Sequence, residues 1–139
     1  MTFSAPQSLY NTPPVLSIYI TGLVMEDISR NGGLVKYAKM TKEKAAKVYE
    51  ALREGEDRGI LREKVKEGSG SLMNIVFDVV GDGMETKFIG GAESRGMKGL
   101  KGHRSVGGIR VSLYNAVTVA NVDVLATYMR EFIKENGAA

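Results

Sequence analysis

The sequence predicts an α+β domain in which a small antiparallel or mixed sheet has helices packed on it. Residues 72–80 form the clearest predicted strand, because apolar and more polar side chains alternate from Met73 to Val79. Residues 34–54 and 119–135 carry apolar side chains at helical spacing, which indicates helices with one buried face. Successive strands are joined by short turns, and this arrangement favours a small sheet covered by helices.

Length and composition limit the classes of protein to consider. The chain has 139 residues, which suits one domain or a part of a larger protein, and 43% of them are hydrophobic. It contains no cysteine and one histidine, so disulfides and thiolate sites are excluded and we expect no metal site. There are 19 Lys and Arg against 16 Asp and Glu, a balance that does not argue for binding to nucleic acid.

No segment is expected to enter a membrane. The most apolar run, residues 15–25, is too short to cross a bilayer and is interrupted by Ser17, Thr21 and Gly22. The first residues lack a basic region followed by an apolar one, so no secretory signal is predicted. Together with the absence of cysteine, these features predict a cytoplasmic protein.

The first predicted helix follows an extended lead-in. Thr12 is expected to be its N-cap and Pro13 its first helical residue, and it should run to about Arg30, before the sequence Asn31-Gly32-Gly33. Its first turns are apolar on nearly all sides. A helix of this kind is buried all round, so we expect it to belong to a larger core or to a subunit interface.

A helix and two strands are predicted next. Residues 34–54 form a helix whose apolar stripe begins at Leu34, with Lys and Glu on the opposite face. Residues 58–66 are a strand of mixed polarity, and the strand 72–80 follows after a glycine- and serine-rich turn.

The second half of the chain is predicted to contain helices at 84–95 and 119–135. Between them, strands at 97–101 and 109–114 frame a glycine-rich loop. Thr118 is the expected N-cap of the final helix, which should stop at a glycine, Gly137.

The candidate site lies in and beside this glycine-rich loop, within residues 101–110. His103 and Arg104 precede Gly107-Gly108, and Arg110 follows them. Arginine offers paired donors that match carboxylate or phosphate oxygens, and the two glycines permit a sharp reversal that keeps the two arginines from being splayed apart. The pattern indicates a pocket wall for a small ligand with two anionic ends, and the alternative is a surface hairpin with solvated charges.

Two motifs resemble the phosphoserine aminotransferase family. The longer one, Gly102-His103-Arg104-Ser105-Val106-Gly107-Gly108-Ile109-Arg110 and its continuation to Val117, resembles that family's C-terminal signature. The stretch from Tyr10 to Val24, with Asn11-Thr12-Pro13-Pro14, resembles the start of the family's long connecting helix. Gly32-Gly33 and Met73-Asn74-Ile75 also fall where the family has them, so the resemblance covers nearly the whole chain from Leu9 onward.

The resemblance implies a class V aminotransferase with the type I fold of pyridoxal-phosphate enzymes. It implies a homodimer that transfers the amino group of glutamate to 3-phosphohydroxypyruvate, giving phosphoserine and 2-oxoglutarate on the route to serine. Arg110 resembles the residue that binds the substrate α-carboxylate, and His103 and Arg104 resemble the pair that binds the phosphate of phosphoserine or the side-chain carboxylate of glutamate. Asn11 and Thr12 resemble the pair that reaches the cofactor phosphate of the neighbouring subunit.

The resemblance also assigns no catalytic residue to this chain. The family's Schiff-base lysine belongs to a large cofactor domain that precedes Asn11, and no lysine here resembles it. We therefore expect residues 1–14 to be a lead-in from that domain and residues 15–139 to be the C-terminal small domain with its connecting helix, an inactive fragment that does not hold the cofactor alone. The alternative is a free-standing anion-binding or regulatory module; a nucleic-acid-binding loop is disfavoured because aromatic residues are not interleaved with its basic ones.

Overall fold

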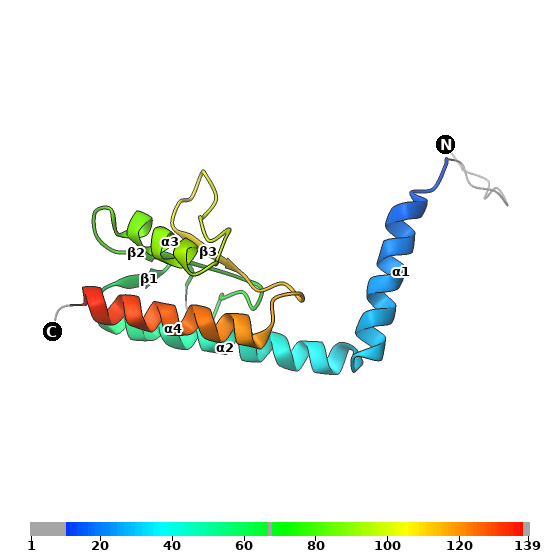
Figure 1. The fold of residues 1–139 in the computed structure, drawn as a ribbon, viewed down its shortest axis with the longest axis horizontal. Coiled ribbons are helices and arrows are strands. Elements are labelled where there is room, and N and C mark those ends of the chain that lie inside the picture. The colour runs from blue at the N-terminus through cyan, green and yellow to red at the C-terminus, as the bar shows by residue number, and fades with distance from the viewer. Residues whose placement is uncertain (1–10, 67, 138–139) are drawn as a thin grey trace. The chain divides into compact units, whose positions relative to one another are not determined.

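The computed structural model describes residues 11–66 and 68–137, which fall into two compact units, the described part of 1–37 and that of 38–139. Figure 1 shows the helices and strands in chain order: α1 (Val15–Arg30), α2 (Gly33–Asp57), β1 (Leu61–Glu63), β2 (Asn74–Val79), α3 (Met84–Ser94), β3 (Ile109–Ser112) and α4 (Val119–Asn136).

In the N-terminal unit, α1 begins two residues later than the sequence predicts. Pro14 is the N-cap residue and Val15 the first helical one, and no side chain caps the helix. The prediction of Thr12 as N-cap and Pro13 as first residue was wrong. Pro13 itself precedes a proline, which disfavours the helical conformation at Pro13, so the helix and its N-cap both begin two residues later. No residue of α1 is buried within the described chain.

In the second unit, three antiparallel strands form a sheet in the order β1-β2-β3. The central strand β2 alternates between buried and half-buried residues. Ile75, Phe77 and Val79 therefore lie on an inner face that contributes to the core, whereas Asn74 and Asp78 lie on the outer face. The α+β class with a small antiparallel sheet is confirmed.

Aromatic side chains join the inner face of the sheet to the helices. The Phe88 ring on α3 lies 5.9 Å from the Phe77 ring of β2 and 5.1 Å from the Phe132 ring of α4, between centroids, with edge-on geometry in both pairs. The hydroxyl of Tyr128 donates to the Phe88 carbonyl over 2.7 Å, so the one polar atom of this cluster is paired.

Helices α2 and α4 run side by side and parallel (Figure 1). Two ion pairs join them, Lys47 to Asp123 at 2.6 Å and Arg130 to Glu54 at 2.8 Å, and both link residues 76 positions apart. Because the offset is the same in both pairs, the two helices run in the same direction. The start of α4 matches the sequence prediction, since Thr118 forms a capping box with Asn121, and Gly137 ends the helix.

Two strand predictions require correction. Residues 97–101 do not form a strand, and Lys101 contributes only an isolated bridge to Ile109; Gly99 has a φ of +78°, which interrupts an extended run. The strand expected at 58–66 shortens to β1, because α2 continues to Asp57 and Gly59 turns the chain with a φ of +68°.

Candidate functional site

The glycine-rich loop, residues 102–108, is closed at its base by backbone hydrogen bonds. The N–H of Gly102 donates to the Gly108 carbonyl at 2.7 Å, and that of Arg110 donates to the Leu100 carbonyl at 2.8 Å. A Cβ on Gly102 would collide with the Gly107 carbonyl, and one on Gly108 would lie 2.7 Å from Asp78 Oδ1. Glycine is therefore required at 102 by the close approach of the two arms of the loop, and at 108 by the close approach of the chain to β2. Figure 1 shows the loop (yellow) projecting beyond β3.

Within the loop, the backbone turns tightly around His103. Its carbonyl oxygen accepts from the N–H groups of Val106 (3.0 Å) and Gly107 (2.8 Å). Its Nδ1 accepts from the Ser105 N–H at 3.3 Å and lies 2.7 Å from the Ser105 hydroxyl. Because a backbone N–H can only donate, Nδ1 is the acceptor in this contact, which leaves Nε2 as the ring nitrogen that can donate to a ligand.

Arg110 occupies the outer face of β3, directly opposite Val76 of β2. It is exposed, as are His103 and Arg104. The chain reverses through Gly107 and Gly108, whose φ values are +66° and +73°, so the loop ends two residues before Arg110. The reversal expected from the sequence is present. His103 and Arg104 lie on the loop before it, and Arg110 lies on the strand after it.

Three charged residues that the sequence did not single out hold this loop. The Nζ of Lys64 lies 2.8 Å from Asp78 Oδ1 and also donates to the Val106 carbonyl at 2.8 Å. Glu85 Oε2 accepts from the Gly108 N–H at 3.2 Å. The hydrogen bond from Lys64 lowers the pKa of Asp78 below its usual value, and Arg62 at 3.1 Å adds to this effect.

A buried lysine lies behind the site. Lys44 of α2 is fully buried, and its Nζ donates to the carbonyls of Leu113 (3.1 Å), Tyr114 (2.9 Å) and Val117 (2.9 Å). All three of its protons have acceptors, while burial lowers the pKa of the group. The sequence did contain a signal for the burial of Lys44, because the residue lies four positions before Val48 and therefore on the same, buried face of α2.

Asn11 and Thr12 lie in the N-terminal unit, where both side chains are exposed immediately before the two prolines. An exposed amide and hydroxyl can donate hydrogen bonds to phosphate oxygens, so these residue types fit the phosphate of pyridoxal phosphate.

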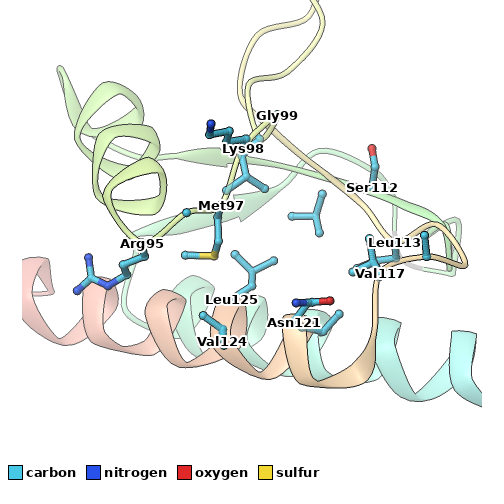
Figure 2. A pocket seen from close by; sticks show the side chains of 15 residues that line it. Arg95, Met97, Lys98, Gly99, Ser112, Leu113, Val117, Asn121, Val124 and Leu125 are labelled. Carbon is cyan, nitrogen blue, oxygen red and sulfur yellow. The ribbon is translucent and has the colours of Figure 1, made fainter.

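A separate cavity of about 510 Å³ lies on the inner side of β3, between that strand, α4 and residues 95–100. Figure 2 shows Met97, Leu113 and Leu125 among the side chains that surround it. None of the candidate residues lines it, because Arg110 and Val111 point to opposite faces of the sheet. The candidate anion site is therefore a surface formed by the loop and the outer face of the sheet.

Among residues 11–66 and 68–137, no group of three or more His, Cys, Asp or Glu side chains is placed to hold a metal ion. No helix in the same part of the chain is long and apolar enough to cross a membrane.

Comparison with known proteins places this chain beside one group of enzymes. Residues 1–125 match the model of the "Aminotransferase class-V" family. A phosphoserine aminotransferase of Acidithiobacillus ferrooxidans is 40% identical over 135 residues, 97% of this chain but 37% of that protein. One from Leptospira biflexa is 44% identical over 130 residues, 94% of this chain and 35% of that protein. The chain thus spans little more than a third of the length of these relatives.

Solved structures show the same likeness. The phosphoserine aminotransferase from Bacillus circulans subsp. alkalophilus superposes with a TM-score of 0.85 at 39% identity, over 94% of this chain and 36% of that one. A phosphoserine aminotransferase from Trichomonas vaginalis with bound PLP has a TM-score of 0.77 at 35% identity, over 88% of this chain and 34% of that one. These likenesses confirm the fold expected from the motifs, that of a segment of a type I pyridoxal-phosphate enzyme.

Proposed function

Since this chain belongs to the class-V aminotransferase family, we propose that it is the substrate-anion-binding part of a phosphoserine aminotransferase. The whole protein would transfer an amino group between glutamate and 3-phosphohydroxypyruvate, producing phosphoserine and 2-oxoglutarate for serine biosynthesis in the cytoplasm. In this proposal, residues 1–14 lead in from the cofactor-binding part, and residues 15–139 are the small domain with its connecting helix.

One structural observation carries the proposal. The reversal at Gly107-Gly108 places His103 and Arg104 on a loop and Arg110 on the strand that leaves it. Both substrates have an α-carboxylate at one end and a second anion at the other. Arg110 binds the α-carboxylate through its paired donors, while Arg104 and the Nε2–H of His103 bind the phosphate or the distal carboxylate.

The proposal includes pyridoxal phosphate as the cofactor and a homodimer as the active assembly. When bound, the cofactor supplies an electron sink for the amino-group transfer. Asn11 and Thr12 hold its phosphate in the partner subunit through their amide and hydroxyl donors. The work of this chain is then to bind and orient both ends of the substrate.

The test is an assay of the whole polypeptide that contains this chain, with glutamate and 3-phosphohydroxypyruvate as substrates and phosphoserine as the measured product. We expect activity that depends on pyridoxal phosphate and falls when Arg104 is replaced by Ala. Absence of this activity, together with binding of phosphoserine by the chain alone, would instead support the free-standing anion-binding module.

A further inference from the structure

We propose that Lys64, held by Asp78, is a positioning residue that ties down the loop bearing His103 and Arg104 and thereby sets affinity for the distal anion of the substrate. The consequence for the substrate rests on the proposed function, whereas the tether itself rests on the geometry alone.

Lys64 is itself held in place by the sheet and by Asp78. It directly follows β1, and its N–H donates to the Val76 carbonyl of β2 at 3.3 Å, so its backbone continues the sheet. Its side chain is only 19% exposed and that of Asp78 is 25% exposed. A shielded charge-assisted pair at 2.8 Å is better defined than an exposed one, such as Arg62 with Asp78, in which the arginine side chain is 71% exposed.

Lys64 also donates a hydrogen bond to the loop. Its Nζ donates to the Val106 carbonyl, two residues after Arg104. Apart from the hydrogen bonds within the loop around His103, the described contacts otherwise hold it to the rest of the domain only at its base, between Gly102 and Gly108, and by Glu85 at Gly108. The Val106 side chain is 60% exposed, so packing does not fix this arm. Lys64 is thus the tether of the outer arm.

Loss of the Lys64 tether should affect the binding of the two ends of the substrate differently. Arg110 is on β3 and is held by the β2–β3 ladder, so loss of the tether leaves it in place. His103 and Arg104 would sample more conformations, and the distal anion would have to order them on binding. The effect should therefore appear in KM for substrates with a distal anion, while kcat and the reaction of alanine stay unchanged.

A direct attraction between Lys64 and the anion is the competing explanation, and Asp78 distinguishes the two. If Lys64 acts by its charge, Asp78→Asn removes a nearby negative charge and lowers KM for phosphoserine. If Lys64 acts by position, Asp78→Asn releases the lysine and raises that KM, as Lys64→Met does.

The experiment combines two measurements on Lys64→Met, Lys64→Arg and Asp78→Asn. Arg62→Met is the matched control, because among the described residues Arg62 also pairs with Asp78 but forms no hydrogen bond or ion pair with the loop. Amide hydrogen exchange by NMR on this chain follows the N–H groups of Val106 and Gly107, with the β2–β3 amides as the internal check of folding. Kinetics on the whole polypeptide compare phosphoserine, glutamate and alanine.

For Lys64→Met and Asp78→Asn we expect exchange at Val106 and Gly107 to increase about tenfold, with KM for phosphoserine and glutamate raised by a similar factor. Lys64→Arg should restore part of both, and Arg62→Met should change neither. Unchanged exchange in Lys64→Met would overturn the tether, and a lower KM in Asp78→Asn would overturn the positioning role. The wild-type polypeptide could also prove to have no aminotransferase activity while Lys64→Met still exchanges faster at Val106 and Gly107. That outcome would uphold the tether and reject the proposed function.

Discussion

The ammonium group of Lys44 lies 2.9 Å from the carbonyl oxygen of Val117, although the two residues are 73 positions apart. This contact joins α2 to the turn between β3 and α4. Two further carbonyls of the same turn accept the remaining protons, so a fully buried charge is satisfied entirely by the backbone. The segment that leaves the Arg110 strand is consequently anchored to a helix on the opposite side of the core.

Replacement of Lys44 by Met should strongly destabilise the fold. Methionine fills similar space but removes the ammonium donor from three carbonyls, of which only that of Tyr114 keeps another donor, the Val117 N–H at 2.9 Å. We therefore expect a loss of about 3 kcal/mol in the free energy of unfolding. Lys47→Met is the matched control on the same helix, since its ion pair with Asp123 is exposed to solvent and should contribute little to stability. Urea unfolding of both variants tests this, and equal losses would contradict it.

Stability should depend on the ionisation of Asp78 in acid. The pKa of Asp78 is lowered by Lys64, so its contribution is complete above the unfolded value of about 3.9 and is lost as the pH falls through the lower folded pKa. Urea midpoints at a series of pH values between about 5 and 2 should decline less steeply for Asp78→Asn than for the wild type. Parallel profiles would mean that the Asp78–Lys64 pair does not couple folding to protonation.

The two arginines should divide the substrate between them. If the whole polypeptide has the proposed aminotransferase activity, Arg110→Ala should reduce kcat/KM for glutamate and alanine alike, because both have an α-carboxylate. Arg104→Ala should reduce it for glutamate about ten- to a hundredfold and nearly spare alanine. The decisive measurement is the ratio of kcat/KM for glutamate to kcat/KM for alanine in the two variants. If Arg104→Ala lowered kcat/KM equally for both substrates, the assignment of the two arginines would be wrong.

The chain alone should form no stoichiometric Schiff base with pyridoxal phosphate. The one lysine that is buried among the described residues, Lys44, has all three protons engaged by carbonyls and is shielded from a ligand. After incubation, gel filtration and borohydride treatment, mass spectrometry should find no single modified site. A stoichiometric adduct at one lysine would show that this chain contains a cofactor-binding lysine that the resemblance did not identify.

The exposed apolar surface of α1 should promote association. Leu16, Tyr19 and Leu23 are 71%, 64% and 47% exposed, and apolar neighbours surround them. We expect the sedimentation coefficient of the wild-type chain to rise with protein concentration, and this rise to be smaller in Leu16→Lys. The matched control is Val124→Lys, since Val124 is 51% exposed and is the one exposed large hydrophobic residue of α4; this change should have no effect. A strictly monomeric wild-type chain would contradict the prediction.

Local sequence patterns predicted the parts of the fold that local physics controls. The alternation in β2, the capping of α4 at Thr118 and the reversal at Gly107-Gly108 each depend on residues close together in the chain. The contacts of Lys44 and Lys64 span 69 and 42 positions to Leu113 and Val106, and lysines on such segments look like solvated charges until the fold is known. The assigned roles of His103, Arg104, Arg110, Asn11 and Thr12 remain predictions.

Both tethers of the glycine-rich loop bind main-chain atoms, since Lys64 donates to a carbonyl and Glu85 accepts from an N–H. Every amino acid offers a carbonyl at position 106, so the side chains at 103–106 can be exchanged without removing the support beneath them. The backbone of the loop can therefore carry different side chains at positions 103–106. Evolution or protein engineering could retune the loop toward other acidic substrates while Gly102, Gly108 and the surrounding framework stay unchanged.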